Sequence, residues 1–364
     1  MILMNDFQAE PAALRQAMAA AASRVLASGW YVLGPEVQAF ERQWAERCGT
    51  AHCVGVANGL DAIELILRGL DIGAGDEVVT TPMTAFATVL AILRAGAVPV
   101  LADIDPATGL LSPDSVERCL SPRTRAVLLV HLYGQVRDMD RWQALCAKAG
   151  IALLEDCAQA HLARWDGRAA GSIGAAGAYS FYPTKNLGAI GDGGAVVCHD
   201  DILAQRIARL RNYGQSERYL HPELGMNSRL DELQAALLIE RLKVLDTCTQ
   251  RRRAIAARYD AAIRHPRIDS LAPPLQAESH VHHLYVLRCA DRAALQAHLT
   301  TKGVQTLIHY PVPVHHQLPC QNLRTDPAGL PQAEWHAARC LSIPCHPYLS
   351  DAQVDQVIAA LNSF

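Results

Sequence analysis

A single lysine stands out in the stretch FYPTKNLGAIGDGGAVV, which covers residues 181–197. Lys185 follows an aromatic run and precedes a glycine-rich run, and no other lysine or arginine lies between Arg168 and Arg206. An ammonium group among apolar residues is costly unless water or an acid stabilises it. Lys185 is therefore either a solvated charge or a chemically active amine.

An acid and a hydroxyl stand at the ends of neighbouring predicted strands. IALLEDCAQAH reads as a buried strand that ends with Glu155 and Asp156, and the next strand, GAYSFYPTK, carries Ser180 just before Lys185. A buried carboxylate needs a facing cation. Because ligands collect at the carboxyl ends of such strands, we expect the acid, the hydroxyl and the amine to converge there.

A third feature is the stretch VANGLDAIEL, which reads as a strand, an Asn-Gly turn and a helix. Free backbone N–H groups at a helix start form an anion site. The chain lacks G-x-x-x-x-G-K-[ST] and has no G-x-G-x-x-G after its first strand, which argues against nucleotide-triphosphate and dinucleotide sites. Pyridoxal phosphate accounts for all the parts: a lysine for the Schiff base, an acid for the pyridine nitrogen, and a phosphate cradle.

Composition limits the function classes. The 364 residues are 50% hydrophobic and 19% charged with a net charge of −3, as in a globular protein with room for two domains. No basic run resembles a nucleic-acid footprint, and no apolar stretch is long enough to span a bilayer. The N-terminus lacks the pattern of a signal peptide. We therefore expect a cytoplasmic protein without nucleic-acid or membrane partners.

Cysteine and histidine give no metal signature. The eleven cysteines are scattered without a C-x-x-C pair, and the interpretation is buried, reduced thiols. Fifteen histidines invite a metal hypothesis, but HLYVLRC and HYPVPVHH stand beside no paired cysteines and no H-E-x-x-H helix. No metal site is predicted.

Short apolar runs alternate with helical segments through the first two thirds of the chain, which predicts a mostly parallel sheet covered on both faces. The seven expected strands are residues 52–57, 76–81, 97–104, 125–134, 151–158, 177–182 and 194–199. Helices are expected at residues 35–49, 59–70, 84–96 and 140–150.

The pattern changes after about residue 230. A long helical segment, interrupted once, is followed by elements typical of a smaller α/β domain, ending in a helix that Ser350 would cap. The expected elements are strands at 279–289 and 304–310 and helices at 292–303 and 350–361. We predict a large domain over residues 1–245, with an N-terminal helical segment, and a small C-terminal domain over residues 246–364.

Seven motifs, in order along nearly the whole chain, resemble those of a known family. They are YVLGPEVQAFE, GVANGLDAIEL, GAVPVLADIDP, EDCAQAH, SFYPTKNLGAIGDGGAVV, GMNSRLDELQAA and HYPVPVH. The chain resembles the pyridoxal phosphate-dependent sugar aminotransferases of the DegT/DnrJ/StrS type, which have the aspartate-aminotransferase fold. The resemblance implies an α/β fold of the type I class, with a mostly parallel seven-stranded sheet and a smaller C-terminal α/β domain.

The resemblance implies a role for each matching residue of the large domain. Lys185 would form the Schiff base and move the proton, Asp156 would pair with the pyridinium nitrogen, and Gln159 would lie against the ring or its phenolic oxygen. Ser180 would bind the phosphate. Each has a plain alternative: a solvated lysine, a helix N-cap, a loop residue and a backbone-bonded serine.

Two further contacts to the cofactor depart from the family pattern or depend on a partner. Gly59 and Leu60 would give their N–H groups to the phosphate, although the family often has threonine where Leu60 stands; a plain strand-to-helix turn is the alternative. Asn227 would reach the phosphate from the partner subunit, which implies a homodimer with shared active sites, unless it only caps the following helix. Arg229 would grip the carboxylate of the amino donor, or form an ordinary salt bridge.

One departure from the family pattern concerns the residue that stacks on the pyridine ring of the cofactor. The family has an aromatic residue stacked on the pyridine ring where this chain has Ala85, so Phe86 would take that role or pack in the core. From the small domain, His309, Tyr310 and His315 would contact the sugar or its phosphates, with packing around the prolines as the alternative. Tyr31 would lie at the mouth of the site, or in the core.

The implied reaction is transamination from an amino acid, L-glutamate by resemblance, to a nucleotide-linked keto-hexose. Leu60 in ANGLDA is a weak indication of a 3-keto-6-deoxy sugar. A 4-keto sugar and a cyclitol ketone stay open. A dehydratase of the same family would have histidine in place of Lys185, and a non-catalytic sensor with the same fold is the alternative from another class.

Overall fold

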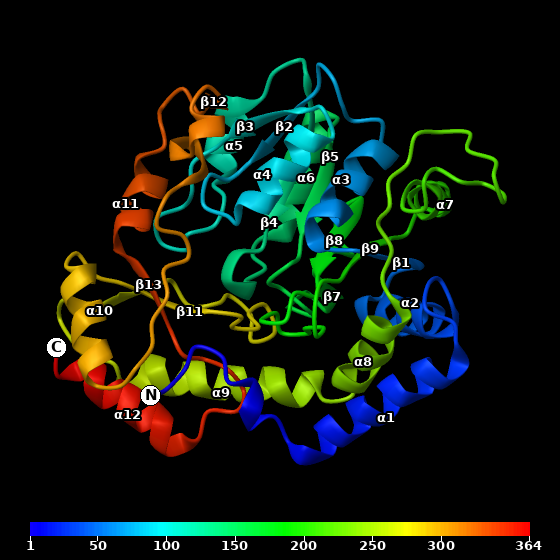
Figure 1. The fold of residues 1–364 in the computed structure, drawn as a ribbon. Coiled ribbons are helices and arrows are strands. Elements are labelled where there is room, and N and C mark those ends of the chain that lie inside the picture. The colour runs from blue at the N-terminus through cyan, green and yellow to red at the C-terminus, as the bar shows by residue number, and fades with distance from the viewer.

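The computed structural model describes residues 1–364, and its centre is an eight-stranded sheet in the order β1-β9-β8-β5-β4-β2-β3-β12 (Figure 1). Only β9 runs against its neighbours, so the predicted mostly parallel sheet and its seven strands are confirmed. The strands are β1 (His52–Val56), β2 (Glu77–Thr80), β3 (Val98–Leu101), β4 (Thr124–Val130), β5 (Ala152–Asp156), β8 (Ala176–Ser180), β9 (Gly194–Cys198) and β12 (Arg324–Thr325).

Strand alternation divides the core between the two faces of this sheet. Ala126 and Leu128 of β4 join one buried cluster, whereas Val127 and Leu129 join the other. The first face is covered by α3 (Gly59–Gly69), α4 (Phe86–Arg94) and α7 (Asp201–Leu210), and the second by α2 (Pro35–Cys48), α5 (Pro113–Cys119), α6 (Met139–Ala149) and α8 (Glu232–Leu242). Burial on both faces explains why these strands read as continuous apolar runs.

A second, antiparallel sheet in the order β10-β11-β13 organises the C-terminal part with its own buried cluster. Its elements are β10 (Asp269–Ser270), β11 (Tyr285–Arg288), β13 (Cys340–Ile343), α9 (Leu245–Ala262), α10 (Arg292–Thr301), α11 (Pro331–Arg339) and α12 (Asp351–Asn362). The interrupted long helix is confirmed as α8 and α9, and Ser350 caps α12 with a full capping box. The boundary at residues 245/246 stays a prediction.

The predicted strand over residues 304–310 is wrong in extent. Only two isolated pairings form there, Val304 with Ile2 and Leu307 with Ser342. The prolines that follow, Pro311 and Pro313, offer no N–H group to a ladder, so the segment leaves the sheet and turns back toward β2.

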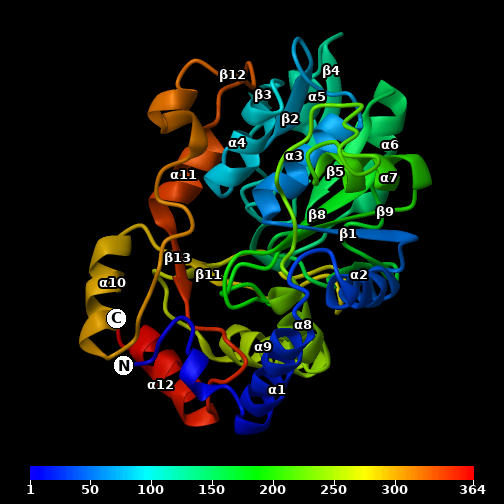
Figure 2. The ribbon, with the colours of Figure 1, turned by 45° about the vertical axis from the view of Figure 1, so that its right-hand side comes forward.

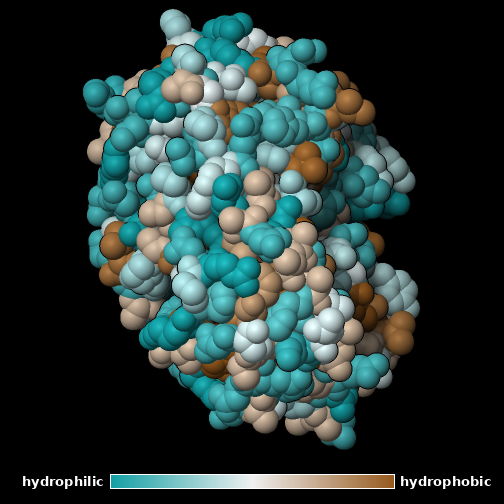
Figure 3. Space-filling model, turned by 90° about the vertical axis from the view of Figure 1, so that its left-hand side faces the viewer, coloured by the Kyte–Doolittle hydropathy of each residue, from teal (hydrophilic) through white to brown (hydrophobic).

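The remaining elements are α1 (Ala12–Ser28), the hairpin β6 (Arg164–Trp165) and β7 (Arg168–Ala169), and the short 3₁₀ turns η1 (Phe7–Ala9), η2 (Leu132–Gly134), η3 (Val314–His316) and η4 (Leu318–Cys320). Figures 1 and 2 show α1, α8, α9 and α12 together along one side of the molecule. The face over the C-terminal elements is mostly hydrophilic with scattered apolar residues (Figure 3). None of the helices has the length and hydrophobicity that a membrane span requires; the cytoplasmic location stays a prediction.

A buried carboxylate joins α2 to α8. Glu232 is 1% exposed, and it accepts hydrogen bonds from the N–H groups of Gly34 at 2.8 Å and of Glu36 and Val37 at 2.9 Å each. These are orphan donors at the start of α2, which has no capping side chain of its own. Glu232 therefore caps a helix that is 195 residues away along the chain.

We predict that Glu232→Ala lowers the free energy of unfolding by about 1–3 kcal/mol, because buried N–H groups lose their acceptor. Denaturant unfolding measures this change. Lys243→Ala is the control, since it removes only a surface pair with Glu240 and should cost less than about 1 kcal/mol. Equal effects of the two substitutions would contradict the capping role.

Candidate active site

Lys185 lies beyond the end of β8 on a loop whose backbone N–H donates to the carbonyl of Tyr182 at 2.9 Å. Its side chain is partly buried, and no carboxylate lies within ion-pair distance. Burial lowers the pKa of Lys185 to about 8, although the charge of Asp156 acts in the opposite direction. The amine is therefore much more available as a neutral base near neutral pH than an ordinary lysine.

Asp156 is the last residue of β5 and is 5% exposed. Its Oδ2 accepts from the hydroxyl of Thr88 at 2.8 Å, and its Oδ1 accepts from the N–H of Ala158 at 3.1 Å. No helix begins directly after Asp156, so the alternative of a helix cap is wrong. The carboxylate has no cation partner and can take a further donor.

Thr88 was missed by the sequence reasoning. It lies in α4, and its hydroxyl also exchanges a hydrogen bond with Thr84 at 2.7 Å. Nothing in the local sequence marks Thr88 as a partner of a residue 68 positions away. Only the packing of α4 against the end of β5 reveals it.

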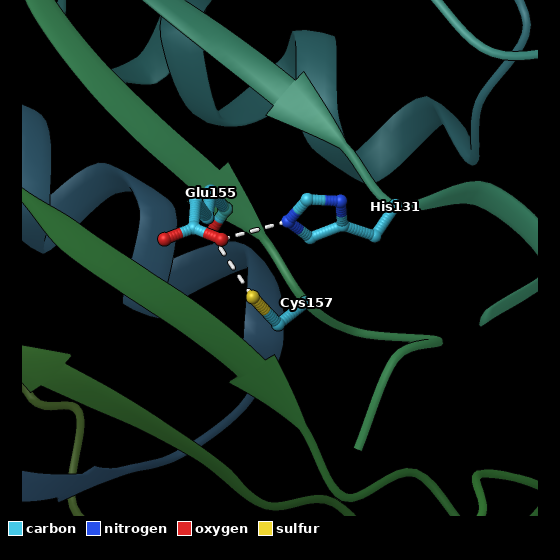
Figure 4. A group of neighbouring side chains, drawn as sticks. All are labelled: His131, Glu155 and Cys157. Carbon is cyan, nitrogen blue, oxygen red and sulfur yellow. Dashed lines mark hydrogen bonds and ion pairs between the residues drawn. The ribbon is translucent and has the colours of Figure 1, made fainter. Parts of the chain in front are cut away.

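Glu155, the neighbour of Asp156, points to the opposite face of the sheet, as strand alternation requires. Figure 4 shows it beside His131 and Cys157, which lie just after the ends of β4 and β5. Each carboxylate oxygen already accepts two hydrogen bonds. The donors are Nε2 of His131 and the N–H of Gly171, both at 2.8 Å, and the N–H groups of Ile173 at 2.9 Å and Gly174 at 2.6 Å.

Glu155 therefore has a structural role, and both of its carboxylate oxygens are already occupied by hydrogen bonds instead of being free to bind a metal ion. Burial opposes the charge on Glu155, but the bonds from His131 and the backbone outweigh it and lower the pKa of this carboxyl. Of the two adjacent acids, only Asp156 faces Lys185.

The start of α3 forms a cradle of unsatisfied donors. The side chain of Asn58 caps the helix by accepting from the N–H of Asp61 at 2.8 Å. The N–H groups of Gly59 and Leu60 find no acceptor in the protein. A Cβ added at Gly59 would come within 2.6 Å of the Cβ of Ser180, so glycine allows the helix start to meet the end of β8. Free N–H groups beside a serine hydroxyl fit a phosphate.

The C-terminal part of the chain contributes His309 and Tyr310 to the site, and we call these residues the second wall. Nε2 of Gln159 donates to the hydroxyl of Tyr310 at 3.2 Å, and Oε1 of Gln159 accepts from the N–H of Tyr133 at 2.6 Å. Burial raises the pKa of Tyr310 to about 12. Burial, together with the charge of Lys185, lowers the pKa of His309 to about 4. Gln159, His309 and Tyr310 therefore gather around Lys185 and Asp156 as neutral polar groups.

Three further candidate residues make no hydrogen bond to this cluster. His315 pairs with Glu334 of α11 at 3.1 Å. Phe86 begins α4 and is 36% exposed, and Tyr31 is 53% exposed, so neither is core. Their contacts with a ring or a sugar stay predictions.

Asn227 and Arg229 lie together in a separate hollow that does not include Lys185. Asp231, not Asn227, occupies the N-cap position of α8, so that alternative for Asn227 is wrong. Nη1 of Arg229 donates to Oδ1 of Asn212 at 3.0 Å, and the guanidinium lies 5.2 Å above the ring of Tyr213. No carboxylate pairs with Arg229, so the alternative of an ordinary salt bridge is wrong as well.

The lowered pKa of Lys185 has a consequence for stability. Between about pH 8 and the ordinary pKa of lysine, the unfolded chain binds a proton that the folded chain has lost, so Lys185 makes stability rise with pH in that window. We predict that Lys185→Met, in protein freed of pyridoxal phosphate, is more stable than the parent at pH 7. The difference should shrink by pH 10. Denaturant unfolding at both pH values measures it, and a constant difference would contradict the burial of the amine.

Comparison with known proteins places this site in a family. Residues 13–362 match the model of the DegT/DnrJ/EryC1/StrS aminotransferase family. The chain is 47% identical over 98% of both chains to the "Erythromycin biosynthesis sensory transduction protein EryC1" of Saccharopolyspora erythraea. It is 45% identical to the "dTDP-3-amino-3,4,6-trideoxy-alpha-D-glucose transaminase" of Streptomyces venezuelae, over 99% of this chain and 95% of the relative.

Solved structures agree. The crystal structure of S. venezuelae DesV in complex with a ketimine intermediate has a TM-score of 0.96 and 44% identity, and covers 100% of this chain and 98% of DesV. A second structure, NtdA from Bacillus subtilis, contains the bound cofactor PMP, with a TM-score of 0.88 and 28% identity over 97% of this chain and 82% of NtdA. The predicted fold, and the prediction of a sugar aminotransferase that uses pyridoxal phosphate, are confirmed at the level of the family. The chain belongs to the DegT/DnrJ/EryC1/StrS aminotransferase family.

Proposed function

We propose that this protein moves an amino group from L-glutamate to a nucleotide-linked 3-keto-6-deoxyhexose. One observation carries the proposal: a partly neutral lysine beside a buried carboxylate with no cation, next to a helix start with free N–H groups. The names of relatives such as the dTDP-3-amino-3,4,6-trideoxy-alpha-D-glucose transaminase support the 3-keto sugar. Leu60, which replaces a common threonine, adds weak support.

When bound, pyridoxal phosphate would supply an electron sink for the transfer of the amino group. Nζ of Lys185 would anchor it and would serve as the base that moves the proton. Asp156 would keep the pyridine nitrogen protonated, and Thr88 and the N–H of Ala158 hold the carboxylate in place. Because Asp156 lies in a low-dielectric site, its charge acts strongly.

The remaining residues bind and orient. Gly59, Leu60 and Ser180 would hold the phosphate, and Gln159 would lie against the ring. Phe86 would cover the ring face in place of Ala85. The sugar and its phosphates contact residues of the second wall and of the mouth of the site, namely His309, Tyr310, His315 and Tyr31.

Asn227 and Arg229 act on the site of the partner subunit in a homodimer. Their hollow is open, and neither side chain is engaged by a carboxylate of its own chain. Asn227 would bind the partner's phosphate, and Arg229 is the candidate that the sequence suggests for the donor carboxylate.

The direct test supplies L-glutamate and one keto-substrate at a time: a dTDP-3-keto-6-deoxyhexose, its 4-keto isomer and a cyclitol ketone. Mass spectrometry of the product identifies the aminated substrate. Amination of the 3-keto sugar alone supports the proposal. Preference for the 4-keto sugar or the cyclitol would overturn the substrate assignment, and amination of none would favour the sensor function that the name of EryC1 suggests for that relative.

We predict that Asp156→Asn lowers turnover about a hundredfold or more, because the neutral amide no longer stabilises the protonated ring. Lys185→Ala should abolish turnover while the protein still binds the cofactor noncovalently. The matched control is Asp114→Asn, which changes an exposed acid that pairs with Arg141 on the surface. Near-normal turnover of Lys185→Ala would refute the mechanism.

If each active site is shared between the two subunits of a homodimer, two inactive variants should complement each other. Lys185→Ala and Asn227→Ala should each be inactive alone, but mixing the two denatured proteins and refolding them should restore activity. In a mixed dimer one site carries both changes and the other carries none, so about a quarter of the parent activity is expected. Subunit mixing followed by the turnover assay measures it. No recovery, with mixed dimers present, would show that Asn227 serves its own chain.

A further inference from the structure

Two adjacent histidines face one glutamate in the C-terminal part of the chain. His315 and His316 belong to the 3₁₀ turn η3, and Glu334 lies in the first turn of α11. Nε2 of each histidine approaches the same atom, Oε1 of Glu334, at 3.1 Å from His315 and 3.4 Å from His316. Glu334 pairs with no lysine or arginine. We call these three residues the histidine cluster.

Hydrogen bonding accounts for only one of the two contacts in the histidine cluster. The contact of His315 has the length of a hydrogen bond, whereas the 3.4 Å between Nε2 of His316 and Oε1 of Glu334 is longer than a good N–H···O bond. The two imidazole rings are also close, with centroids 4.1 Å apart and planes tilted by 56°. The three possible ligand atoms all lie within 4.8 Å of one another, as ligands around a single ion do.

The spacing of these atoms fits a zinc ion. Zinc binds imidazole nitrogen at about 2.0–2.1 Å and carboxylate oxygen at about 2.0–2.2 Å, with tetrahedral angles. Two ligands bound in this way lie roughly 3.3 Å apart. The two nitrogen–oxygen distances of the cluster, 3.1 and 3.4 Å, lie on either side of this value. Two imidazoles and one carboxylate are also a ligand set that zinc takes in proteins.

Metal ions bind the neutral form of imidazole, and the surroundings of His315 favour that form. Burial lowers the pKa of His315; the hydrogen bond to Glu334 opposes this shift, and the charge of His316 supports it. The side chain of His315 is 12% exposed, whereas those of His316 and Glu334 are 52% and 50% exposed. An ion can therefore enter the cluster directly from solvent.

Both elements that carry the cluster are fixed by segments of the large sheet. Asp103, shortly after β3, accepts from the N–H groups of Gln332 at 2.9 Å and Ala333 at 2.8 Å, and so satisfies free donors at the start of α11. The N–H of Val314 in η3 donates to the carbonyl of Pro82, just after β2, at 2.9 Å. Ligands carried by elements that are held in place favour a defined metal geometry.

We propose that His315, His316 and Glu334 bind a Zn²⁺ ion, with the fourth position open to water. The ion ties the segment that follows the second wall to α11, and a contact of His315 with a phosphate of the sugar then passes through it. The inference does not rest on the proposed function, because its ligands include neither Lys185 nor Asp156. No cysteine pair or H-E-x-x-H helix marks the site in the sequence, since the glutamate lies 19 positions after His315 on another element.

Isothermal titration calorimetry tests the proposal on protein that is loaded with pyridoxal phosphate and first freed of metal ions. ZnCl₂ should bind with one ion per chain, whereas MgCl₂ should not, because Mg²⁺ prefers oxygen ligands. His316→Ala and Glu334→Gln should each weaken zinc binding by more than about tenfold, since even the loss of an outer-shell partner costs about 10–100-fold. Both side chains are half exposed, so neither substitution disturbs the core.

His199→Ala is the matched control. His199 is an exposed histidine just after β9, outside the histidine cluster. Its substitution removes one surface imidazole and should leave the zinc affinity unchanged. A parent protein that takes up no zinc would overturn the proposal. So would an unchanged affinity in either His316→Ala or Glu334→Gln, because the ion would then lie elsewhere or lack one of the three ligands.

A second measurement identifies the ligand atoms directly. X-ray absorption at the zinc edge, on the parent protein with one equivalent of Zn²⁺, should show only nitrogen and oxygen neighbours, at about 2.0–2.2 Å, with the signature of two imidazoles. The chain has eleven free cysteines that could compete for the ion. Sulfur neighbours at about 2.3 Å would place the ion on cysteines and overturn the proposal.

Discussion

The structure depends on one electrostatic constraint: the partly buried amine of Lys185 and the buried carboxylate of Asp156 lie in one site without forming an ion pair. Each is held by the protein in a different way. Burial weakens the charge on Lys185 and lowers its pKa to about 8, whereas Asp156 is held by a hydroxyl and a backbone N–H. A group that carries its own aldehyde and its own basic nitrogen satisfies both partners at once, which is why this pair suits pyridoxal phosphate.

The parallel sheet makes this arrangement possible. The ends of β5 and β8 and the start of α3 meet at one edge, so segments about 100 residues apart in the chain supply the acid, the hydroxyl and the phosphate cradle. Behind that edge, Glu155 ties the end of β5 to the loop before β8 through three hydrogen bonds and to His131, just after β4, through a fourth. The C-terminal part then adds Tyr310, which reaches Gln159. The site is complete only when both parts of the chain are folded together.

Periodicity predicted the seven main strands and the interrupted helix before β10, because continuous apolar runs between helices have few other interpretations. The sequence also allowed Lys185 and Asp156 to be predicted as site residues, since a lone lysine and a strand-terminal acid stand out in it. Thr88 could not be predicted, because its role depends on Asp156, a partner 68 positions away that no local pattern reveals. The strand expected at 304–310 failed for another reason: only Val304 and Leu307 pair with another segment, and the prolines that follow offer no N–H group to a ladder. The two-residue β12 is too short to leave any periodic signal.

The most direct test of the central claim is the visible absorption spectrum of the protein loaded with pyridoxal phosphate, before and after addition of L-glutamate. The account predicts a yellow absorption band from the cofactor joined to Lys185, bleached by glutamate and restored by the keto-sugar. A protein that binds the cofactor but does not respond to glutamate would leave the cofactor site intact and contradict the assignment of the donor. A protein that cannot be loaded with pyridoxal phosphate would contradict the claim that the Lys185 and Asp156 pair is built for this cofactor.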